Sequence, residues 1–448
     1  MTVPNASTNP ASADPPAADP GSAQHGSGKQ PPVSFRSLLA ASSGNIVEWY
    51  DWTVYSSFAI FFSTQIFPKG NGATALLATF GVFALGFFAR PLGGWLLGAF
   101  TDRHGRRAGL TLTIVMMAAG SLVIGLTPTY SSAGIAAPII LTVARLLQGL
   151  SVGGEIGSST TYLAEIAPPG RRGFIGSFFY ASTAAGLLLA SGLATLLTST
   201  LSDSAMTEWG WRIPFLIGGA GALAGLWLRR SLEETTIFEQ AVASGERTPR
   251  PLVTLMTQHR GAALRIMGFT VAITIGFYLF MSYLPTYAVQ TTGIAKSEAF
   301  LANTIALIVF LIEMPLFGRL SDRFGRRPQL LVCSIGYALL SVPLMIFMEG
   351  TFWSVLAVEL VGVTLYALYG AIAPALMAEQ FPTAVRAVGI GAPYNLTVAL
   401  FGGTAPYLLT WLNSQGRDIW FFWYFAAAAG VSTIAYWTMP ESRGKPLN

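Results

Sequence analysis

The segment GAFTDRHGRR at residues 98–107 returns as GRLSDRFGRR at residues 318–327. Both copies read G-x-x-x-D-R-x-G-R-R, and both lie between apolar runs that are long enough to span a bilayer. A loop repeated between two apolar halves indicates an internally duplicated membrane protein. Such duplication is typical of transporters, so transport is the first function that the sequence suggests.

The composition also indicates a membrane protein. Charged residues make up 10% of the 448 residues, hydrophobic residues make up 52%, and the mean hydropathy is +0.54. Soluble domains carry about 25% charged residues, and strands of a membrane barrel would be shorter and less uniformly apolar. We therefore predict an all-α membrane protein with twelve transmembrane helices in two six-helix halves, at about residues 38–65, 75–99, 108–128, 136–160, 174–198, 212–229, 263–289, 298–317, 328–348, 353–377, 386–411 and 418–439.

The placement of basic residues accounts for the net charge of +5. If both termini are cytoplasmic, 20 of the 26 Lys and Arg residues fall on the cytoplasmic side. This is the positive-inside bias of membrane proteins, and it sets the orientation. We expect a multi-pass protein of the lipid bilayer with cytoplasmic N- and C-termini, and the positive charge requires no nucleic acid partner.

The alternation of polar and apolar stretches predicts two helical bundles joined by a linker. The first residues are rich in Ala, Pro, Ser and Gly and contain no apolar core, which is typical of a disordered tail. The predicted parts are a disordered cytoplasmic tail (1–34), an N-terminal six-helix bundle (35–229), a cytoplasmic linker (230–262), a C-terminal six-helix bundle (263–440) and a short cytoplasmic tail (441–448).

A second repeated loop supports the duplication. Ala164-Glu165 followed by Arg171-Arg172 is echoed by Ala378-Glu379 followed by Arg386. Two loops thus occur in matching order between twelve predicted spans. Two six-helix halves related by a parallel repeat form the layout of major facilitator transporters, whose substrate sites lie at the midplane between the halves.

The first repeated loop has a mechanical interpretation. Gly98 and Gly318 allow close approach of helix backbones, and Asp102 and Asp322 can cap the helix that follows each of them. The arginines can pair with these carboxylates, bond helix-end carbonyls or reach lipid headgroups. One hypothesis is that the charges only set topology, and the other is a gate that closes in one state and opens in another. The candidate gating residues here are Gly98, Asp102, Arg106, Gly318, Asp322 and Arg326.

Ionisable residues inside membrane helices are energetically costly, which makes each one a candidate functional residue. In the first helix, Asn45, Glu48, Asp51 and Tyr55 lie on one stripe at helical spacing. Two carboxylates one turn apart repel each other in a medium of low dielectric constant, which favours the binding of a proton. Glu48 and Asp51 are therefore candidate proton-coupling residues.

Two arginines are predicted to lie inside the membrane. Arg145 shares a stripe of the fourth helix with Gln148 and Glu155, and Arg90 lies in the second helix. Either could form a structural ion pair with a buried carboxylate. Alternatively, an arginine could bind a substrate carboxylate in bidentate fashion and be released by protonation of Asp51 or Glu48. Arg145 is then a candidate for coupling, and Arg90, Arg145, Tyr55 and Gln148 are candidates for binding substrate.

The second half is less charged. Glu313 and Glu359 lie within predicted helices, where each could pair structurally or lie near an end. Tyr278, Tyr283 and Asn395 could supply neutral hydrogen bonds to a polar ligand, or the tyrosines could belong to the aromatic belt. The chain offers no metal-ligand cluster and no nucleophile–base pair in the membrane. We expect no metal, no cofactor and no enzymatic activity, and we expect a monomer.

At these residues the chain resembles the metabolite:H⁺ symporter family of the major facilitator superfamily. The resemblance covers residues 38 to 440, nearly the whole predicted membrane region. The segments that carry it are ASSGNIVEWYDW (41–52), GVFALGFFARPLGGWLLG (81–98), ARLLQGLSVGGEIG (144–157), EWGWRIPF (208–215), LWLRRSLEET (226–235) and FGGTAP (401–406).

The resemblance implies import of an organic carboxylate with protons across a bacterial inner membrane, with the proton as coupling ion. The family's functional positions correspond to Glu48, Asp51, Arg90 and Arg145, and in the loop to Asp102, His104 and Arg106. His104 is added on this basis to the candidate gating residues. The second copy has Phe324 at that place, so His104 could instead be a solvated side chain.

The first half is most similar to members that carry 2-oxoglutarate, which is our first candidate substrate. One departure is that the seventh predicted helix has Pro285-Thr286 where a basic residue is expected near Thr286. This leaves citrate, other dicarboxylates, shikimate-like acids, monocarboxylates and betaines open. A drug or metabolite exporter and a membrane sensor are the other classes considered, but the exporter's proline-glycine signature is missing from 173–197 and no soluble sensory domain is present.

Overall fold

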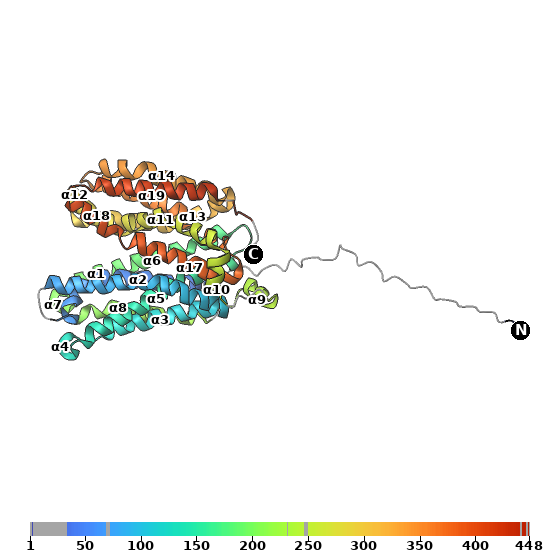
Figure 1. The fold of residues 1–448 in the computed structure, drawn as a ribbon. Helices are drawn as coiled ribbons and strands as arrows, with labels where there is room; N and C mark the ends of the chain where they lie inside the picture. Colours follow the sequence, from blue (N-terminus) through green and yellow to red (C-terminus); the bar gives the residue numbers. More distant parts are fainter. Residues whose placement is uncertain are drawn as a thin grey trace. The chain divides into compact units, whose positions relative to one another are not determined.

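The structure is a computed structural model that describes residues 34–68, 72–230, 232–245, 250–439 and 441–444, together with Thr2 and Leu447. The tail predicted at residues 1–34 therefore lies outside the described residues, apart from Thr2 and Ser34. The described residues from Ser34 onward belong to one compact unit. Among them, every regular element is a helix (Figure 1).

The first six predicted runs correspond to six long helices. They are α1 (Phe35–Ile66), α2 (Gly72–His104), α3 (Arg106–Leu126), α5 (Ala136–Ile166), α6 (Arg172–Thr200) and α8 (Arg212–Arg229). Shorter elements connect them, namely α4 (Tyr130–Ala133), α7 (Asp203–Ala205) and the π-helix η1 (Met206–Gly210). The stretch predicted as a linker contains two short helices, α9 (Thr236–Ala243) and α10 (Pro251–Gln258).

The last six predicted runs are also helical, and several of them are interrupted. The elements are α11 (Arg260–Tyr278), π-helix η2 (Leu279–Tyr283) and α12 (Leu284–Thr292); α13 (Lys296–Phe324); α14 (Arg326–Ile346); α15 (Phe352–Gly370) and α16 (Ala373–Ala378); 3₁₀ helix η3 (Thr383–Val385), α17 (Arg386–Thr397), π-helix η4 (Val398–Gly402) and α18 (Ala405–Ser414); and α19 (Ile419–Thr438).

The helices have the lengths that a bilayer requires. Ten helical stretches of the described residues are long and apolar enough to cross a membrane, and α7–η1 with α8 form an eleventh that is bent by 45°. The remaining predicted run is α1, which is 32 residues long and contains the polar residues Asn45, Glu48 and Asp51. The predicted class, an all-α membrane protein with twelve helices in two halves, is confirmed by this architecture.

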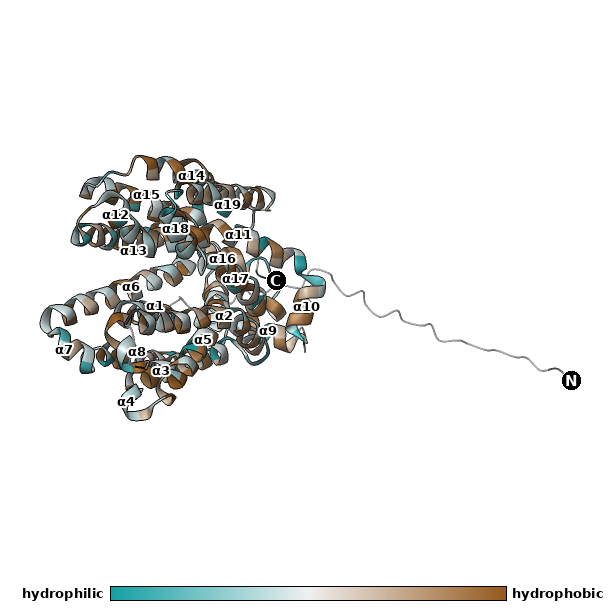
Figure 2. Cartoon of the chain, turned by 60° about the vertical axis from the view of Figure 1, so that its left-hand side comes forward, coloured by the Kyte–Doolittle hydropathy of each residue, from teal (hydrophilic) through white to brown (hydrophobic). Residues whose placement is uncertain are grey.

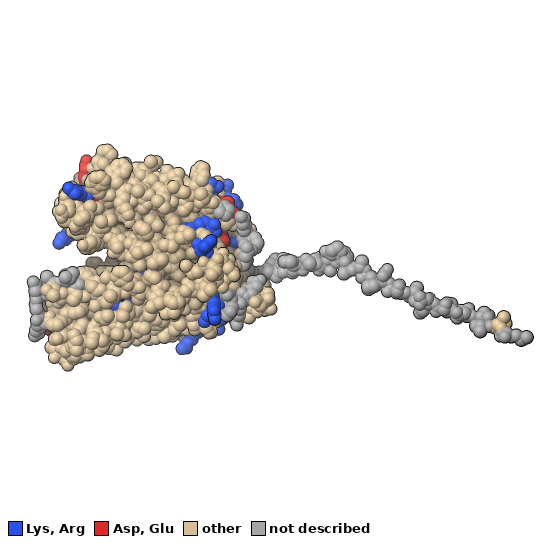
Figure 3. Space-filling model, in the orientation of Figure 1, with Lys and Arg blue, Asp and Glu red and all other residues tan. Residues whose placement is uncertain are grey.

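The outside of the molecule is apolar between two charged ends. Large side chains such as Phe88, Leu339 and Trp353 are 72%, 67% and 75% exposed, and hydrophobic residues recur along the helices (Figure 2). Lys and Arg side chains gather at the two ends and leave the belt between them almost uncharged (Figure 3). Lipid tails can cover such a belt, whereas its exposure to water would have a large free-energy cost.

The most extensive contacts between the two halves are those of α6 with α13 and of α2 with α17, and α5 also packs against α16 and α17. A Cβ atom added to Gly98 would lie 2.9 Å from the Cα of Val388, and one added to Gly318 would lie 2.6 Å from the carbonyl oxygen of Gly173. Both distances are too short for a side chain. The predicted close approach at Gly98 and Gly318 is therefore confirmed, and it occurs between the halves.

Candidate functional site

The carboxylate of Asp102, near the end of α2, binds backbone groups of the other half. The N–H groups of Ala387 and Val388 donate to its two oxygens at 3.0 and 2.9 Å. These residues form the first turn of α17, where unpaired N–H groups and the helix dipole attract negative charge. The prediction that Asp102 caps the following helix, α3, is therefore wrong, because its carboxylate accepts from the first turn of α17 while the first N–H groups of α3 donate to Glu234.

Asp322 makes the mirror-image contact. It lies near the end of α13, and its two oxygens accept from the N–H groups of Gly173 and Phe174, both at 2.9 Å. These residues begin α6, which belongs to the first half. The prediction for Asp322 is corrected in the same way, and each aspartate closes the contact between the two halves.

Two glutamates that the sequence analysis did not select cap the following helices instead. Glu234 accepts from the backbone N–H groups of Arg106 and Arg107 at 2.9 and 3.2 Å. Glu441 accepts from the corresponding groups of residues 326 and 327, both at 3.0 Å. Each glutamate follows the sixth helix of its half, and this shared position is the signal by which the sequence could have revealed them.

The last glycine of each loop motif makes room for these caps. Gly105 and Gly325 have φ angles of 106° and 103°, which residues with a Cβ atom rarely adopt. A Cβ atom on Gly105 would also lie 2.1 Å from an oxygen of Glu234. Partial burial by itself raises the pKa of Glu441, but the backbone N–H donors around it hold that pKa below its ordinary value.

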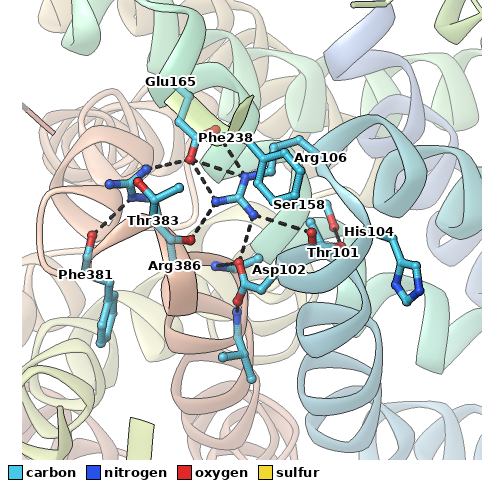
Figure 4. Close-up of polar contacts among 12 residues, drawn as sticks. Thr101, Asp102, His104, Arg106, Ser158, Glu165, Phe238, Phe381, Thr383 and Arg386 are labelled. Carbon is cyan, nitrogen blue, oxygen red and sulfur yellow. Dashed lines mark hydrogen bonds and ion pairs between the residues drawn. The ribbon is translucent and has the colours of Figure 1, made fainter. Parts of the chain in front are cut away.

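The arginines of the motif complete a buried network at this face, shown for the first copy in Figure 4. Arg106 lies 2.9 Å from both Asp102 and Glu165 and donates to the carbonyl oxygen of Thr383 at 2.9 Å. Glu165 also pairs with Arg386 of the other half at 2.5 Å. We call Asp102, Arg106, Glu165 and Arg386 the first network.

The second copy repeats this arrangement with the halves exchanged. Arg326 lies 2.8 Å from Asp322 and 3.5 Å from Glu379. Glu379 also lies 3.7 Å from Arg172, which belongs to the first half. We call Asp322, Arg326, Glu379 and Arg172 the second network. Together the two networks tie the halves to each other at one face, which we call the network face.

His104 is not part of either network. Its side chain is exposed, its ring stacks on Phe100 with the ring centroids 4.3 Å apart, and its Nδ1 atom lies 3.1 Å from the carbonyl oxygen of Phe100. Figure 4 shows it pointing away from Asp102 and Arg106. Its role in gating stays a prediction that these contacts do not support.

A cavity lies deeper in the molecule, between the two halves. In this closed conformation its volume is small, about 20 Å³. It is lined by Trp49, Arg90, Tyr180, Ile273, Thr274, Phe277, Tyr278, Tyr366, Tyr394 and Val398. Arg90 is the only charged residue among these described lining residues. A single cation surrounded by tyrosine hydroxyls and aromatic rings suits a small organic anion.

Arg90 keeps hydrogen-bonding capacity for such an anion. It is 3% exposed, its guanidinium lies 4.1 Å from the ring centres of both Trp52 and Phe87, and its Nη1 is 3.5 Å from the hydroxyl of Tyr278. Its Nε has no partner among the described residues. Since a buried donor without a partner is unfavourable, a carboxylate in the cavity would satisfy it.

A second polar cluster is buried inside the N-terminal half. Asp51 accepts hydrogen bonds from Ser121 and from the amide nitrogen of Gln148, the latter at 2.7 Å. The amide oxygen of Gln148 accepts from Arg145 at 2.7 Å. Gln148 thus links a carboxylate to a guanidinium, and the guanidinium also lies 4.0 Å from the ring centre of Tyr55. All four predicted residues, Asp51, Tyr55, Arg145 and Gln148, meet here and are fully buried.

Trp52 connects this cluster to the cavity, although the sequence analysis gave it no role. Its ring centre lies 4.5 Å from the guanidinium of Arg145 and 4.1 Å from that of Arg90. Cation–π contacts of this kind stabilise a buried guanidinium by about 2 kcal/mol. Trp52 adjoins Asp51 in the sequence, and its place on the stripe between Glu48 and Tyr55 could have indicated it.

The alternative that either arginine forms a structural ion pair with a nearby carboxylate finds no support. Glu155 pairs with Arg229 at 2.5 Å, and within the described residues neither Arg90 nor Arg145 is ion-paired. Glu48 is 6% exposed and, in the same part of the chain, makes no side-chain hydrogen bond. It therefore stays a predicted proton-coupling residue, and the nearby guanidinium of Arg90 acts on it electrostatically without forming an ion pair.

The remaining predicted residues lie in different places. Tyr278 lines the cavity. Tyr283 bonds Thr410 at 2.5 Å and lines a separate, smaller cavity. Asn395 donates to the carbonyl oxygens of Gly153 and Gly391 at 2.9 and 2.7 Å, which ties α17 to α5. No group of three or more His, Cys, Asp or Glu side chains that could hold a metal ion occurs among the described residues.

Two six-helix halves, a largely aromatic cavity between them that contains one arginine, and matched loops at one face define a transporter of the major facilitator type. Residues 37–448 match the model of the sugar (and other) transporter family, and the chain belongs to this family. The alpha-ketoglutarate permease of Escherichia coli K12 is 42% identical over 92% of this chain and 94% of its own length.

Two further proteins are similar to the chain, one in sequence and one in fold. The citrate-proton symporter of Klebsiella pneumoniae is 34% identical over 89% of this chain and 91% of its own length. The solved structure of the proton:xylose symporter XylE bound to 6-bromo-6-deoxy-D-glucose shares the fold, with a TM-score of 0.78 at 21% identity over 92% of this chain and 97% of XylE. The chain is therefore a multi-pass membrane transporter and not an enzyme.

Proposed function

We propose that the protein imports a small organic carboxylate together with protons, with 2-oxoglutarate as the first candidate substrate. The observation that carries this proposal is the cavity between the halves, in which Arg90 is the one charged lining residue among those described. The cavity adjoins a buried cluster that contains the carboxylate of Asp51. A site for an anion, at Arg90, and a site for a proton, at Asp51, thus lie next to each other.

The substrate class is supported by the chemistry of the cavity. A guanidinium binds a carboxylate through two parallel hydrogen bonds, and the hydroxyl groups of Tyr180, Tyr278 and Tyr394 offer neutral donors around it. The 42% identical relative is an alpha-ketoglutarate permease, which favours a dicarboxylate with a keto group. We assign Arg90 and Tyr278 to the substrate and Asp51, Gln148 and Arg145 to the proton.

Electrostatics supplies the coupling. A charged Asp51 offsets the positive charge of Arg145, to which Gln148 connects it. Protonation of Asp51 removes that compensation, so the positive potential in the neighbouring cavity at Arg90 rises and an anion binds more tightly. Because coupling of two binding events is reciprocal, a bound anion also favours the protonated form of Asp51.

The cycle requires the network face to open and close. In this structure both networks hold the halves together at that face. We propose that this face is cytoplasmic, because exposed basic residues gather there, among them Arg103, Arg107 and Arg323. Opening would break the pairs between the halves, and this change would release substrate and proton into the cytoplasm of a bacterium.

The test is uptake of labelled 2-oxoglutarate by the purified protein in proteoliposomes. We expect uptake to rise as the external pH is lowered and to collapse with a protonophore. Uptake that ignores both treatments would exclude symport. Asp51→Asn should abolish accumulation and retain exchange of labelled for unlabelled substrate, whereas a fully active Asp51→Asn protein would remove Asp51 from coupling.

Substitution of the cavity cation tests the binding site. Arg90→Gln should raise the KM by about 10- to 100-fold, since a hydrogen bond to a charged group contributes about 1.5–3 kcal/mol. Arg417→Gln is the matched control, because Arg417 is exposed and lies outside the cavity. An unchanged KM in Arg90→Gln would show that the substrate binds elsewhere.

A monocarboxylate is the second candidate, because a single cation in the cavity matches one carboxylate. Thr286 stands where a basic residue was expected, and Arg90 is the one cation among the described lining residues. Competition of labelled 2-oxoglutarate with pyruvate, succinate, citrate and betaine decides between the classes. If only pyruvate competes, the substrate is a monocarboxylate and not a dicarboxylate.

A further inference from the structure

The C-terminal half buries a carboxylate that the proposed transport cycle does not use. Glu359 on α15 has an exposed fraction of 0%. Among the described residues, the one side chain that donates to its oxygens is the amide of Asn303 on α13, at 3.3 and 3.4 Å. No cation in that part of the chain forms an ion pair with it.

Glu155 in the other half shows what a charged glutamate needs at such a place. It is 2% exposed, pairs with Arg229 at 2.5 Å, and accepts further hydrogen bonds from Thr113 and Ser159. Glu359 has neither the cation nor the hydroxyl groups. An unpaired charge in such surroundings costs several kcal/mol, so the carboxyl group of Glu359 carries its proton in this conformation.

In the internal repeat, Glu359 of the second half corresponds to Arg145 of the first half, a residue of the proposed coupling cluster. Glu359 follows Arg145 at the same interval at which Glu379 of the second network follows Glu165 of the first. Asn303 follows Phe83 at the interval that separates the two loop motifs. The guanidinium carbon of Arg145 lies 5.2 Å from the ring centre of Phe83. In the same way, Glu359 contacts Asn303. The second half therefore holds a carboxyl–amide pair where the first half holds its buried guanidinium.

Asn303 also connects this carboxyl group to the wall of the cavity. Its amide donates to the carbonyl oxygen of Phe280 at 3.2 Å. Phe280 lies in the π-helix η2, and the residues just before that element, Phe277 and Tyr278, line the cavity. Short π-helical segments occur frequently at functional sites because they shift the backbone locally. A change in the protonation of Glu359 can thus alter the cavity wall, because the amide of Asn303 connects the carboxyl group to the backbone of Phe280.

We propose that Glu359 is a second proton-binding site, which gains and loses one proton in each transport cycle alongside Asp51. This inference rests on the proposed symport. When α15 and α13 move and water reaches the carboxyl group, its O–H bond breaks and the proton passes to water on the open side. The resulting carboxylate takes up a proton from the other side before it is buried again.

No charged group on the elements described around α15 would stabilise an ionised Glu359. The helical elements packed against α15 are α11, η2, α12, α13, α14 and α16. The titratable groups of these elements that bond to α15 are Tyr337, which donates to the carbonyl oxygen of Gly362, Glu313, which accepts from Thr364, and Cys333, whose thiol bonds the backbone of Tyr369. No charged side chain of these elements faces Glu359 in the described part of the chain.

The experiment measures protons and substrate together. Proteoliposomes that contain a pH-sensitive dye take up labelled 2-oxoglutarate, and the proton-to-substrate ratio is recorded for the wild type and for Glu359→Gln. Two proton sites predict a ratio of about two for the wild type and about one for the variant. Loss of net uptake with substrate exchange intact would equally support the inference. Glu359→Met, which is also neutral, serves if Glu359→Gln fails to reach the membrane.

The outcomes separate this inference from the proposed function. A wild type without any substrate-linked proton uptake would overturn the symport itself. A wild-type ratio of about one, or an unchanged ratio in Glu359→Gln, would overturn the second site and leave the symport intact. Glu313→Gln is the matched control, since Glu313 is a half-buried carboxyl group bonded to Thr364 of α15 at 2.7 Å. It should keep the wild-type ratio.

Discussion

The two loop networks consist of the same residue types, yet the first is tighter than the second. In the first network the ion-pair distances are 2.9, 2.9 and 2.5 Å, and all four side chains are fully buried. In the second network they are 2.8, 3.5 and 3.7 Å, and the side chain of Asp322 is 10% exposed. A repeated motif therefore specifies which groups meet, whereas the packing around each copy sets how closely they meet.

This difference indicates that the two networks contribute unequally to the stability of the closed state. Removing one partner of a well-paired buried ion pair leaves an uncompensated charge, which costs about 3–5 kcal/mol. Longer pairs contribute less, because their Coulomb energy falls with distance. We therefore expect the first network to dominate closure of the network face.

The largest effect is expected for Glu165→Gln. The substitution removes the negative charge that lies between Arg106 and Arg386 and leaves two buried cations, so closure should weaken by about 3 kcal/mol. Since a tenfold change in an equilibrium constant corresponds to about 1.4 kcal/mol, backbone hydrogen exchange at Ala387 and Val388 should become roughly 100-fold faster. Unchanged exchange at these two amides would contradict the dominance of the first network.

Glu379→Gln is the matched substitution in the second network. Its ion pairs are 3.5 and 3.7 Å long, so closure should weaken by only about 1 kcal/mol. Hydrogen exchange at Gly173 and Phe174 should rise by less than tenfold. An effect equal to that of Glu165→Gln would show that the difference in distances has no energetic consequence.

The smallest effect concerns the cap at Glu441, whose pKa is lowered in the folded protein from its ordinary value of 4.5. A carboxyl group with a depressed folded pKa stabilises the fold above its unfolded pKa, and this contribution is lost as the pH falls through the folded value. The Tm of the wild type should exceed that of Glu441→Gln at pH 7. The difference should shrink as the pH falls below 4.5, and a difference that is the same at pH 3 as at pH 7 would refute the charge-based cap.

The sequence predicted most of the architecture because the relevant signals are local. Apolar runs of bilayer length specify helices wherever they occur, and the repeated loops at Gly98 and Gly318 indicate the duplication without any knowledge of contacts. The stripe of Asp51 and Tyr55 on the first helix likewise predicted a buried polar face, and the structure buries both residues fully. Periodicity identifies such a face because helix geometry is the same in every helix.

The sequence was less successful where two helices from different halves meet. Asp102 and Asp322 were expected to cap the next helix, and both cap a helix of the opposite half. Asn395 stays a predicted substrate residue, and the sequence did not show that its amide ties α17 to α5 in this conformation. Such pairings depend on which segments approach each other after folding, and no spacing along the chain records that approach.

The sequence by itself determined the class of the protein, because membrane insertion and internal duplication depend on composition and repetition along the chain. Only the tertiary structure decided how the charges are paired. It placed Arg90 in the cavity and Arg145 behind Trp52, joined Glu165 to Arg386 across the halves, and left Glu359 without a cation among the described residues. The physical reason is that charge interactions in a low dielectric depend on distances of a few ångströms, and the packing of the two halves sets those distances.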